Sequence, residues 1–258
     1  MRLFMGYVSM VLKSQMQYKI SFLLAALGQF ITAFTSFFGI YFIFDKIEAV
    51  DDFSYGQVLL CFAVVMIAFS VGEMIGGGFA AFPRLLGNGG LDRALVRPRS
   101  VIAQVLLPNV DFTRLGLLAQ AAVVLWIAVS MSEVAWTWEK VLTLILMIGC
   151  GSAVFFGTFL VSAAFTFFTV EATDFLNVFT YGARQFGKYP FSVYGKGVLR
   201  FLTFVIPLAI FQYYPLLYLI DRKSGVLFML SPLLSLLFLI PANAFFRFGL
   251  HKFKSTGS

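Results

Sequence analysis

The chain has 258 residues, of which 60% are hydrophobic and only 12% are charged. A soluble domain of this length exposes much of its surface to water and carries about twice that share of charged residues. The formal charge of +7 suggests nucleic acid binding, but the basic residues form short clusters between apolar runs, as charges facing anionic lipid headgroups do. The composition therefore predicts an all-α, polytopic membrane protein that binds no nucleic acid.

Catalytic and metal-binding side chains are scarce. Cys61 and Cys150 each lie in an apolar run without CxxC spacing, and the one histidine, His251, lies in a basic tail. The sequence has no GxxxxGK[ST] phosphate loop, no HExxH motif and no GxSxG motif. We therefore expect that the chain is no enzyme and has no catalytic residue, metal or cofactor of its own.

Runs free of Asp, Glu, Lys and Arg predict the membrane spans, because a crossing helix needs roughly 20 apolar residues. The six runs cover residues 20–44, 53–72, 115–132, 141–170, 201–220 and 224–246. The second run resumes after Glu73 and reaches Pro83. The first run is too long for a signal peptide and has no small-residue cleavage site at its end, so it should remain as the first span. Residues 1–258 are expected to form a single domain.

Basic residues around these runs predict the orientation. If the N-terminus is cytoplasmic, fourteen basic residues fall in inside segments and four fall in outside segments. Basic residues concentrate on the cytoplasmic side of membrane proteins. Both termini are therefore expected in the cytoplasm.

Three segments depart from simple spans. Residues 1–19 are expected to form an amphipathic interfacial helix, which serves as an anchor or as a surface for a cytoplasmic partner. Residues 169–199 form the longest polar stretch, which suits a short interfacial helix and a turn at Lys188–Tyr189–Pro190. Pro207 and Pro215 interrupt the fifth run, so a re-entrant element near the outer face is an alternative to a full crossing.

The second run contains the acid that lies deepest in any span. Gly72 and Gly76 form a GxxxG pair, which lets another helix approach closely. Glu73 lies between them, and a charge there costs on the order of 2.5–3.5 kcal/mol unless it faces protein or water. We weigh two roles for this intramembrane polar candidate: a functional contact or proton relay, and a structural pair with Arg114, which starts the next span.

The cytoplasmic loop at residues 83–100 carries most of the functional signal. Its arginines fit plain membrane anchoring, but a short helix after Gly90 would also carry Leu91, Leu95 and Val96. Asp92 is expected to cap this helix and Pro98 to stop it. A protruding apolar helix of this kind suits a contact that receives force from another protein.

At this point the sequence resembles the ABC-2 class of ABC-transporter permeases, specifically a bacterial subfamily often encoded as paired permeases beside one ATPase. The resemblance rests first on a G-x-L-D-x-x-L-x-R-P signature, to which Gly90 (or Gly89), Leu91, Asp92, Leu95, Arg97 and Pro98 correspond. Further matches are Tyr189–Pro190, Tyr194, Ile206–Pro207, Tyr213–Tyr214–Pro215, Phe248–Gly249–Leu250 and the tail at residues 254–258. Phe253 stands where the family usually has Tyr.

The resemblance implies six spans, an N-terminal interfacial helix, a coupling helix between the second and third spans, and short re-entrant elements after the fifth. It also implies a transporter of two permeases, identical or paralogous, and two ABC ATPase subunits that bind the ATP, usually an exporter in the bacterial inner membrane. The coupling contact would be made by Gly90, Leu91, Asp92, Leu95, Arg97 and Pro98. Two other functions remain open: a membrane scaffold or assembly factor, and an ion-coupled carrier that uses Glu73. Cargo of an exporter would be amphiphilic if the aromatic-rich spans line its path.

Overall fold

The computed structural model describes residues 2–47, 49–98, 100–169 and 177–253. These residues form helices and loops, with one isolated bridge between Val50 and Phe53. Five helices are long and apolar enough to cross a membrane, or six if one sharply bent pair counts as a span. The expected all-α polytopic fold is confirmed. Arg99 and the family-like tail at residues 254–258 lie outside the described residues.

The helices follow one another closely along the chain. They are α1 (Arg2–Gln15), α2 (Lys19–Phe44), α3 (Tyr55–Gly76), α4 (Phe82–Gly87), α5 (Gly90–Leu95), α6 (Val101–Leu106), α7 (Leu115–Met131), α8 (Trp138–Phe165), α10 (Ala183–Phe186), α11 (Gly195–Phe204), α12 (Leu208–Leu219), α13 (Val226–Ser235) and α14 (Leu239–Lys252).

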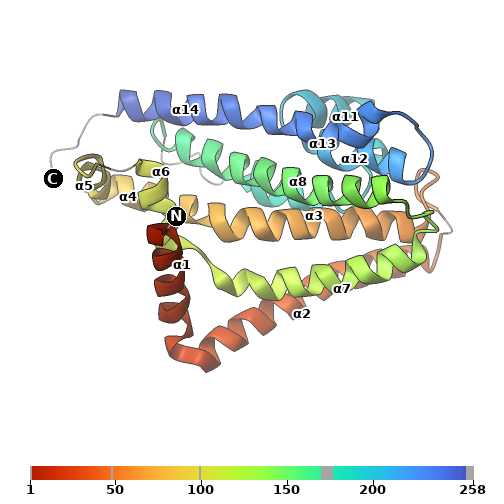
Figure 1. Cartoon of the computed structure of the whole chain (residues 1–258), viewed down its shortest axis with the longest axis horizontal. Helices are drawn as coiled ribbons and strands as arrows, with labels where there is room; N and C mark the ends of the chain where they lie inside the picture. The colour runs from red at the N-terminus through yellow and green to blue at the C-terminus, as the bar shows by residue number, and fades with distance from the viewer. Residues whose placement is uncertain (1, 48, 99, 170–176, 254–258) are drawn as a thin grey trace.

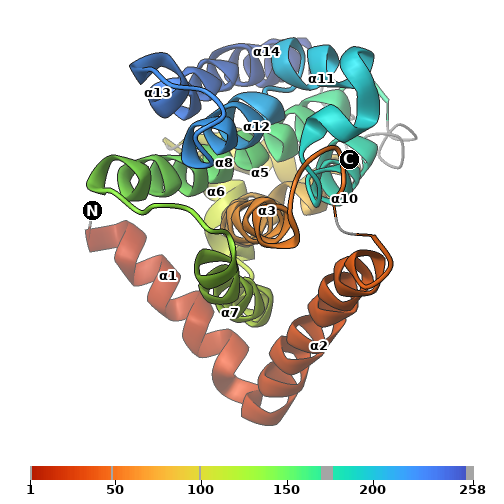
Figure 2. The same ribbon diagram turned by 90° about the vertical axis from the view of Figure 1, so that its right-hand side faces the viewer.

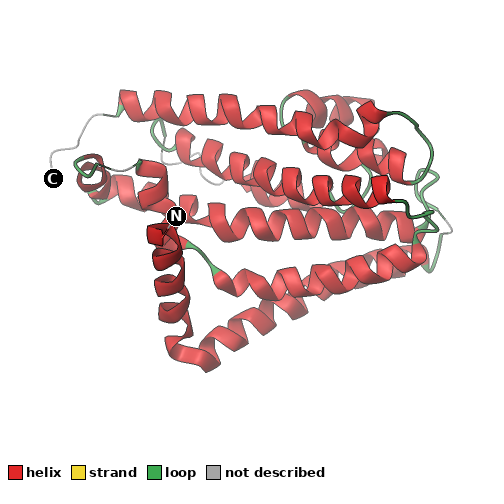
Figure 3. Cartoon of the chain, viewed as in Figure 1, coloured by secondary structure: helices red, strands yellow, loops and turns green. Residues whose placement is uncertain are grey.

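The long helices lie side by side and form a bundle whose two ends differ (Figure 1). The end of α14 gathers at one end with α4, α5 and α6, which we call the terminal end. Loops before α3, before α8 and before α13 gather at the other, which we call the loop end. The same elements appear in Figure 3, where helix dominates and the loops concentrate at the loop end.

Helix α3 forms the centre of the bundle and packs against α7 and α8. In its most apolar stretch 83% of the residues are buried. A Cβ atom at Gly72 would lie 2.8 Å from Cβ of Phe155, and one at Gly76 would lie 3.3 Å from Cβ of Phe159. Both partners belong to α8, so the GxxxG pair does what its spacing predicts: it brings two helices into close contact.

Helix α2 stands at the edge of the bundle, where only 11% of its most apolar stretch is buried (Figure 2). A short turn at Met16–Tyr18 separates it from α1, which runs across the terminal end at a steep angle to the other helices. The Gln15 amide donates to the Val110 carbonyl at 2.6 Å and accepts from the Phe112 N–H at 3.0 Å. The helix expected over residues 1–19 is therefore present and fixed to the bundle, while its role at a membrane interface remains a prediction.

The fifth run does not form one straight span. Helices α11 and α12 are bent by 115° at a break that contains Pro207. Proline has no N–H and disfavours helix in the residue before it, which explains the break. The hydroxyls of Thr203 and Tyr214 lie 3.3 Å apart across the bend. The bend rules out one straight span, and both a broken span and a re-entrant element agree with it.

The polar stretch before α11 also differs from its prediction. A turn at Lys188–Tyr189–Pro190 is present, but it is partly buried and lies along the length of the helices, not at an end of the bundle. Gly187 abuts Val65 in the middle of α3, and Lys188 donates to the Ser36 hydroxyl at 3.0 Å.

Gln212 supplies the physical reason for this correction. Its amide nitrogen donates to the Tyr189 carbonyl at 3.1 Å and to the Gly187 carbonyl at 3.3 Å. Backbone carbonyls freed at the end of α10 therefore find a donor inside the bundle, where they would otherwise be costly. Arg184 and Lys188 drop out of the fourteen basic residues assigned to the cytoplasmic segments. Lys196 and Arg200 drop out as well, because α11 lies in the half of the bundle toward the loop end (Figure 1), and ten remain against four. The predicted orientation does not depend on them.

Candidate functional site

The predicted coupling element is a short hairpin of helices at the terminal end. Helix α3 continues through a 3-10 turn at Gly77–Ala81 into α4, and Gly89 then reverses the chain into α5 with a φ of 63°. This left-handed conformation is one that glycine adopts without steric cost. The sequence thus places a short helix after the glycines, as predicted.

The six predicted coupling residues do not share one face. Leu91 is fully buried, whereas 45% of Leu95 and 86% of Val96 are exposed. Arg97 and Pro98 are also exposed, at the end of α5. The expectation that Leu91 enters a cleft on a partner is therefore wrong, because its side chain already belongs to the core of this chain. Leu95 remains available for a contact.

The capping role expected of Asp92 remains a prediction. Gly89 occupies the N-cap position of α5, and Asp92 lies in the first turn of the helix. A carboxylate there is favoured by the partial positive charge at a helix N-terminus. Gly90 precedes it with little room to spare, since an added Cβ atom would lie 2.7 Å from Cδ1 of Leu85.

The inner side of α5 is tied to the next helix. The Gln104 side chain of α6 donates to the Ala94 carbonyl at 2.9 Å, and Ala94 is itself buried. Ser100 caps α6 by accepting from the Ala103 N–H at 3.3 Å. A short helix held on both flanks keeps one geometry, which a force-transmitting contact requires.

The intramembrane polar candidates come together beside this element. The Arg114 guanidinium lies 3.3 Å from Oε1 of Glu73 and 3.2 Å from Oδ2 of Asp111. Glu73 is only 2% exposed, so its charge is balanced inside the protein and not by water. The pairing weighed from the sequence is therefore present, and it joins α3 to the start of α7.

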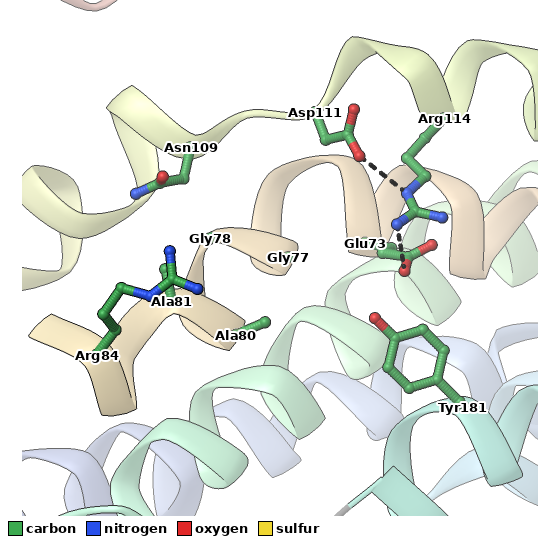
Figure 4. A pocket seen from close by; sticks show the side chains of 10 residues that line it. All are labelled: Glu73, Gly77, Gly78, Ala80, Ala81, Arg84, Asn109, Asp111, Arg114 and Tyr181. Carbon is green, nitrogen blue, oxygen red and sulfur yellow. Dashed lines mark ion pairs between the residues drawn. The ribbon is translucent and has the colours of Figure 1, made fainter. Parts of the chain in front are cut away.

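These side chains line a polar cavity of about 330 Å³ (Figure 4). The wall also includes Gly77, Gly78, Ala80, Ala81, Asn109, Arg84 and Tyr181. The phenol of Tyr181 points toward Glu73, and Arg84 extends from α4 along the opposite wall. The cavity thus connects the core pair to the base of the coupling element.

Sequence reasoning missed Asp111, Tyr181 and Arg84 as members of this cavity. Asp111 precedes Arg114 by three residues, a spacing that favours a local ion pair and was a usable signal. Tyr181 belongs to a segment that the sequence assigned to a helix at the membrane interface, so no local pattern could place it in this cavity. Among the described residues no group of three His, Cys, Asp or Glu side chains is close enough to hold a metal ion.

A sequence model described as ABC-2 family transporter protein matches residues 30–257. Comparison with curated proteins and with solved structures gave no match. The matched range includes all the long helices from the middle of α2 onward, the coupling element and the Glu73–Arg114 pair. Permeases of this family generally work with an ABC ATPase. The chain belongs to the ABC-2 family of transporter proteins and is a membrane-spanning permease component of an ABC-type transporter.

Proposed function

We propose that this chain is the permease subunit of an exporter in the bacterial inner membrane, driven by a separate ABC ATPase that docks on α5. Two permeases, identical or paralogous, and two ATPase subunits form the transporter, and an amphiphilic cargo moves between the permeases. The ATP is bound by the ATPase, in agreement with the absence of a phosphate loop from this sequence.

The exposed tip of α5 is the observation that carries this proposal. Leu95 and Val96 leave apolar surface at the terminal end, away from the lipid-facing parts of the long helices. Burying one leucine against a partner stabilises a contact by about 1.5–3 kcal/mol. Arg93 and Arg97 flank these residues and are exposed, so they supply charge for an acidic rim on the partner.

A continuous path leads from this tip to the core of the permease. Helix α5 follows α4, and α4 extends α3 through one 3-10 turn. Helix α3 is buried on nearly all sides and contacts both α7 and α8. A push on α5 therefore acts on the central helix of the bundle, which is the geometry that a separate motor needs.

Purification of the tagged full-length chain from its native host tests the proposal. The wild-type protein should retain an ATPase that carries a phosphate loop, and Leu95→Asp should release it, because a carboxylate cannot be buried cheaply in an apolar contact. Ile47→Asp is a matched control, since Ile47 is 44% exposed but lies at the loop end. It should retain the ATPase.

The outcomes separate the three functions. Absence of any ATPase from the wild-type complex favours the scaffold or the ion-coupled carrier. Retention of the ATPase by a well-folded Leu95→Asp variant removes the coupling role from α5 and returns its arginines to membrane anchoring.

A further inference from the structure

Lys188 carries a positive charge at mid-depth of the bundle. Its partner Ser36 lies 17 residues after Lys19, so about 25 Å along α2 from its start and about 12 Å from its end. The neighbouring Gly187 lies against Val65, near the middle of α3. An ionisable group at such a depth is costly unless it faces protein or a water-filled cavity, and is usually functional.

This charge has no acidic counterpart. Among the described residues no carboxylate lies within ion-pair distance of Lys188, and its ammonium donates to the neutral hydroxyl of Ser36. Arg184, one helical turn earlier, has a different contact: its guanidinium lies 4.7 Å from the centre of the Phe69 ring. Structural charges in membranes generally pair with each other, as Glu73 and Arg114 do here. Pairing with an acid therefore does not explain the charge of Lys188 at this depth.

A cavity of about 380 Å³ adjoins the ammonium group. It is lined by Thr35, Ser36, Gly39, Ile40, Ile43, Gln185, Lys188 and Tyr189. Thr35, Gly39, Ile43 and Gln185 are exposed, so the cavity opens to the outside of the chain. It therefore combines one unpaired cation with hydroxyl and amide groups that can donate hydrogen bonds to an anion.

Apolar surface also lies in the wall of the cavity. Ile40 and Ile43 of α2 line it, and 41% of Ile43 is exposed. A ligand that places its charged group on Lys188 therefore has apolar surface beside it for a hydrocarbon chain.

We propose that this cavity between α2 and the segment around Lys188 binds an amphiphile with a single anionic group, a phosphate, sulfate or carboxylate, and that the charge of Lys188 selects it. The assignment of this ligand as cargo rests on the proposed exporter function. The binding site itself does not.

Binding of ³²P-labelled dodecyl phosphate to the full-length protein in phosphatidylcholine nanodiscs tests the site, with empty discs as background. Lys188→Met should weaken binding roughly tenfold or more, because a charge-assisted contact is lost. Lys188→Arg should retain binding. Lys196→Met is the matched control, since Lys196 is an exposed lysine of α11 outside the cavity, and should bind as the wild type does.

A second variant fills the cavity without touching the charge. A Cβ atom at Gly39 would meet no heavy atom within 4 Å, so Gly39→Leu adds bulk to the cavity without a backbone clash. It should weaken binding by a similar factor. Gly28→Leu is its control, because Gly28 is equally unobstructed on the same helix but does not line the cavity, and its binding should stay unchanged.

Two results overturn the site: wild-type affinity in both Lys188→Met and Gly39→Leu, or equal competition by dodecyltrimethylammonium, which has the same chain and the opposite charge. The source of the ligand follows from extraction of phospholipid that stays bound through purification. An anionic phospholipid retained by the wild type and lost from Lys188→Met assigns the site to a bilayer lipid. Intact dodecyl phosphate binding without retained phospholipid assigns it to cargo.

This binding test requires no ATPase. A permease that retains its ATPase but binds no dodecyl phosphate contradicts this inference alone. A permease that binds it through Lys188 without any ATPase contradicts the proposed function alone.

Discussion

The two ends of the bundle use charge in opposite ways. At the terminal end Arg93 of α5 and Arg97, just after it, are exposed. At the loop end the charges tie segments of the same chain together: Lys140 lies 2.7 Å from Oδ2 of Asp221, and Tyr218 donates to Glu139 at 2.9 Å. The charges of the terminal end are therefore exposed, whereas those of the loop end join segments of this chain to each other.

The backbone shows the same contrast. At the loop end the left-handed region is occupied by Asp51, Asp52, Glu133 and Asp221, with φ values from 50° to 64°. Non-glycine residues in this region cost on the order of 1–2 kcal/mol each, with Asp and Asn tolerated best. At the terminal end the tight turn into α5 falls to Gly89, which adopts it freely. The loop end therefore holds strained turns that its contacts must stabilise.

The largest expected effect tests the assignment of the two ends to the two sides of the membrane. An alkaline phosphatase fusion, which is active only outside the cytoplasm, should be active at Asp51 and inactive at Ser258. Positive charge between the spans concentrates toward the terminal end, which predicts that this end faces the cytoplasm. Phosphatase activity at Ser258 in a stable fusion would contradict the predicted orientation.

A second prediction separates the inner and outer sides of α5. Leu91→Ala should destabilise the permease by about 2–5 kcal/mol, since it creates a cavity in the core, and should lower its melting temperature in detergent. Leu95→Ala should leave the melting temperature nearly unchanged but reduce retention of the ATPase, since its side chain is half exposed. Equal thermal effects of the two substitutions would show that α5 has no free outer face.

The ion pair between Lys140 and Asp221 at the loop end predicts that its two partners differ in their contribution to stability. Lys140 is 7% exposed in its side chain, whereas Asp221 is 70% exposed. Asp221→Asn should cost about 1–3 kcal/mol, because it leaves a buried ammonium without its counter-charge. Lys140→Met should cost less, since the abandoned carboxylate is solvated. Asparagine also tolerates the positive φ at this position.

Thermal unfolding of the two purified variants measures this difference. If Lys140→Met lowers the melting temperature more than Asp221→Asn does, burial of the ammonium does not determine how much this contact contributes to stability.

The long helices could be predicted from sequence because bilayer thickness sets a minimum length for an apolar run. The runs at 20–44 and 115–132 end within one residue of α2 and α7. The fifth run gave less, because hydropathy counts residues and does not show a bend. Pro207 gave the local signal for a break, but the 115° angle depends on packing against the rest of the bundle.

The parts of the site with local contacts could be predicted from the sequence, and the parts with long-range contacts could not. The helix after Gly89 and the Glu73–Arg114 pair followed from turn chemistry and from the cost of a buried acid. Burial of Leu91 did not, since a six-residue helix with several apolar residues gives no sign of which one faces inward. The position of Lys188 depended on Gln212, which donates to backbone carbonyls about 25 residues away.

The smallest expected effect concerns Glu73. Glu73→Gln removes the negative charge but keeps an amide that can accept from Arg114, and Arg114 retains Asp111 at 3.2 Å. Net charge in this cluster therefore changes by one unit, while Arg114 keeps its ion pair with Asp111. We expect a loss of about 1 kcal/mol in stability, as for a typical hydrogen bond, and nearly normal ATP hydrolysis by the complex with the ATPase.

Arg114→Leu serves as the contrasting variant, because it leaves the buried Glu73 carboxylate uncompensated. Loss of one partner from a buried ion pair typically costs about 3–5 kcal/mol, so this change should lower the melting temperature far more than Glu73→Gln does. The pair then acts as a structural clamp between α3 and the start of α7. A Glu73→Gln protein that folds normally and binds its ATPase but supports no ATP hydrolysis would instead assign Glu73 a direct functional role, since neither packing nor pairing would account for the loss.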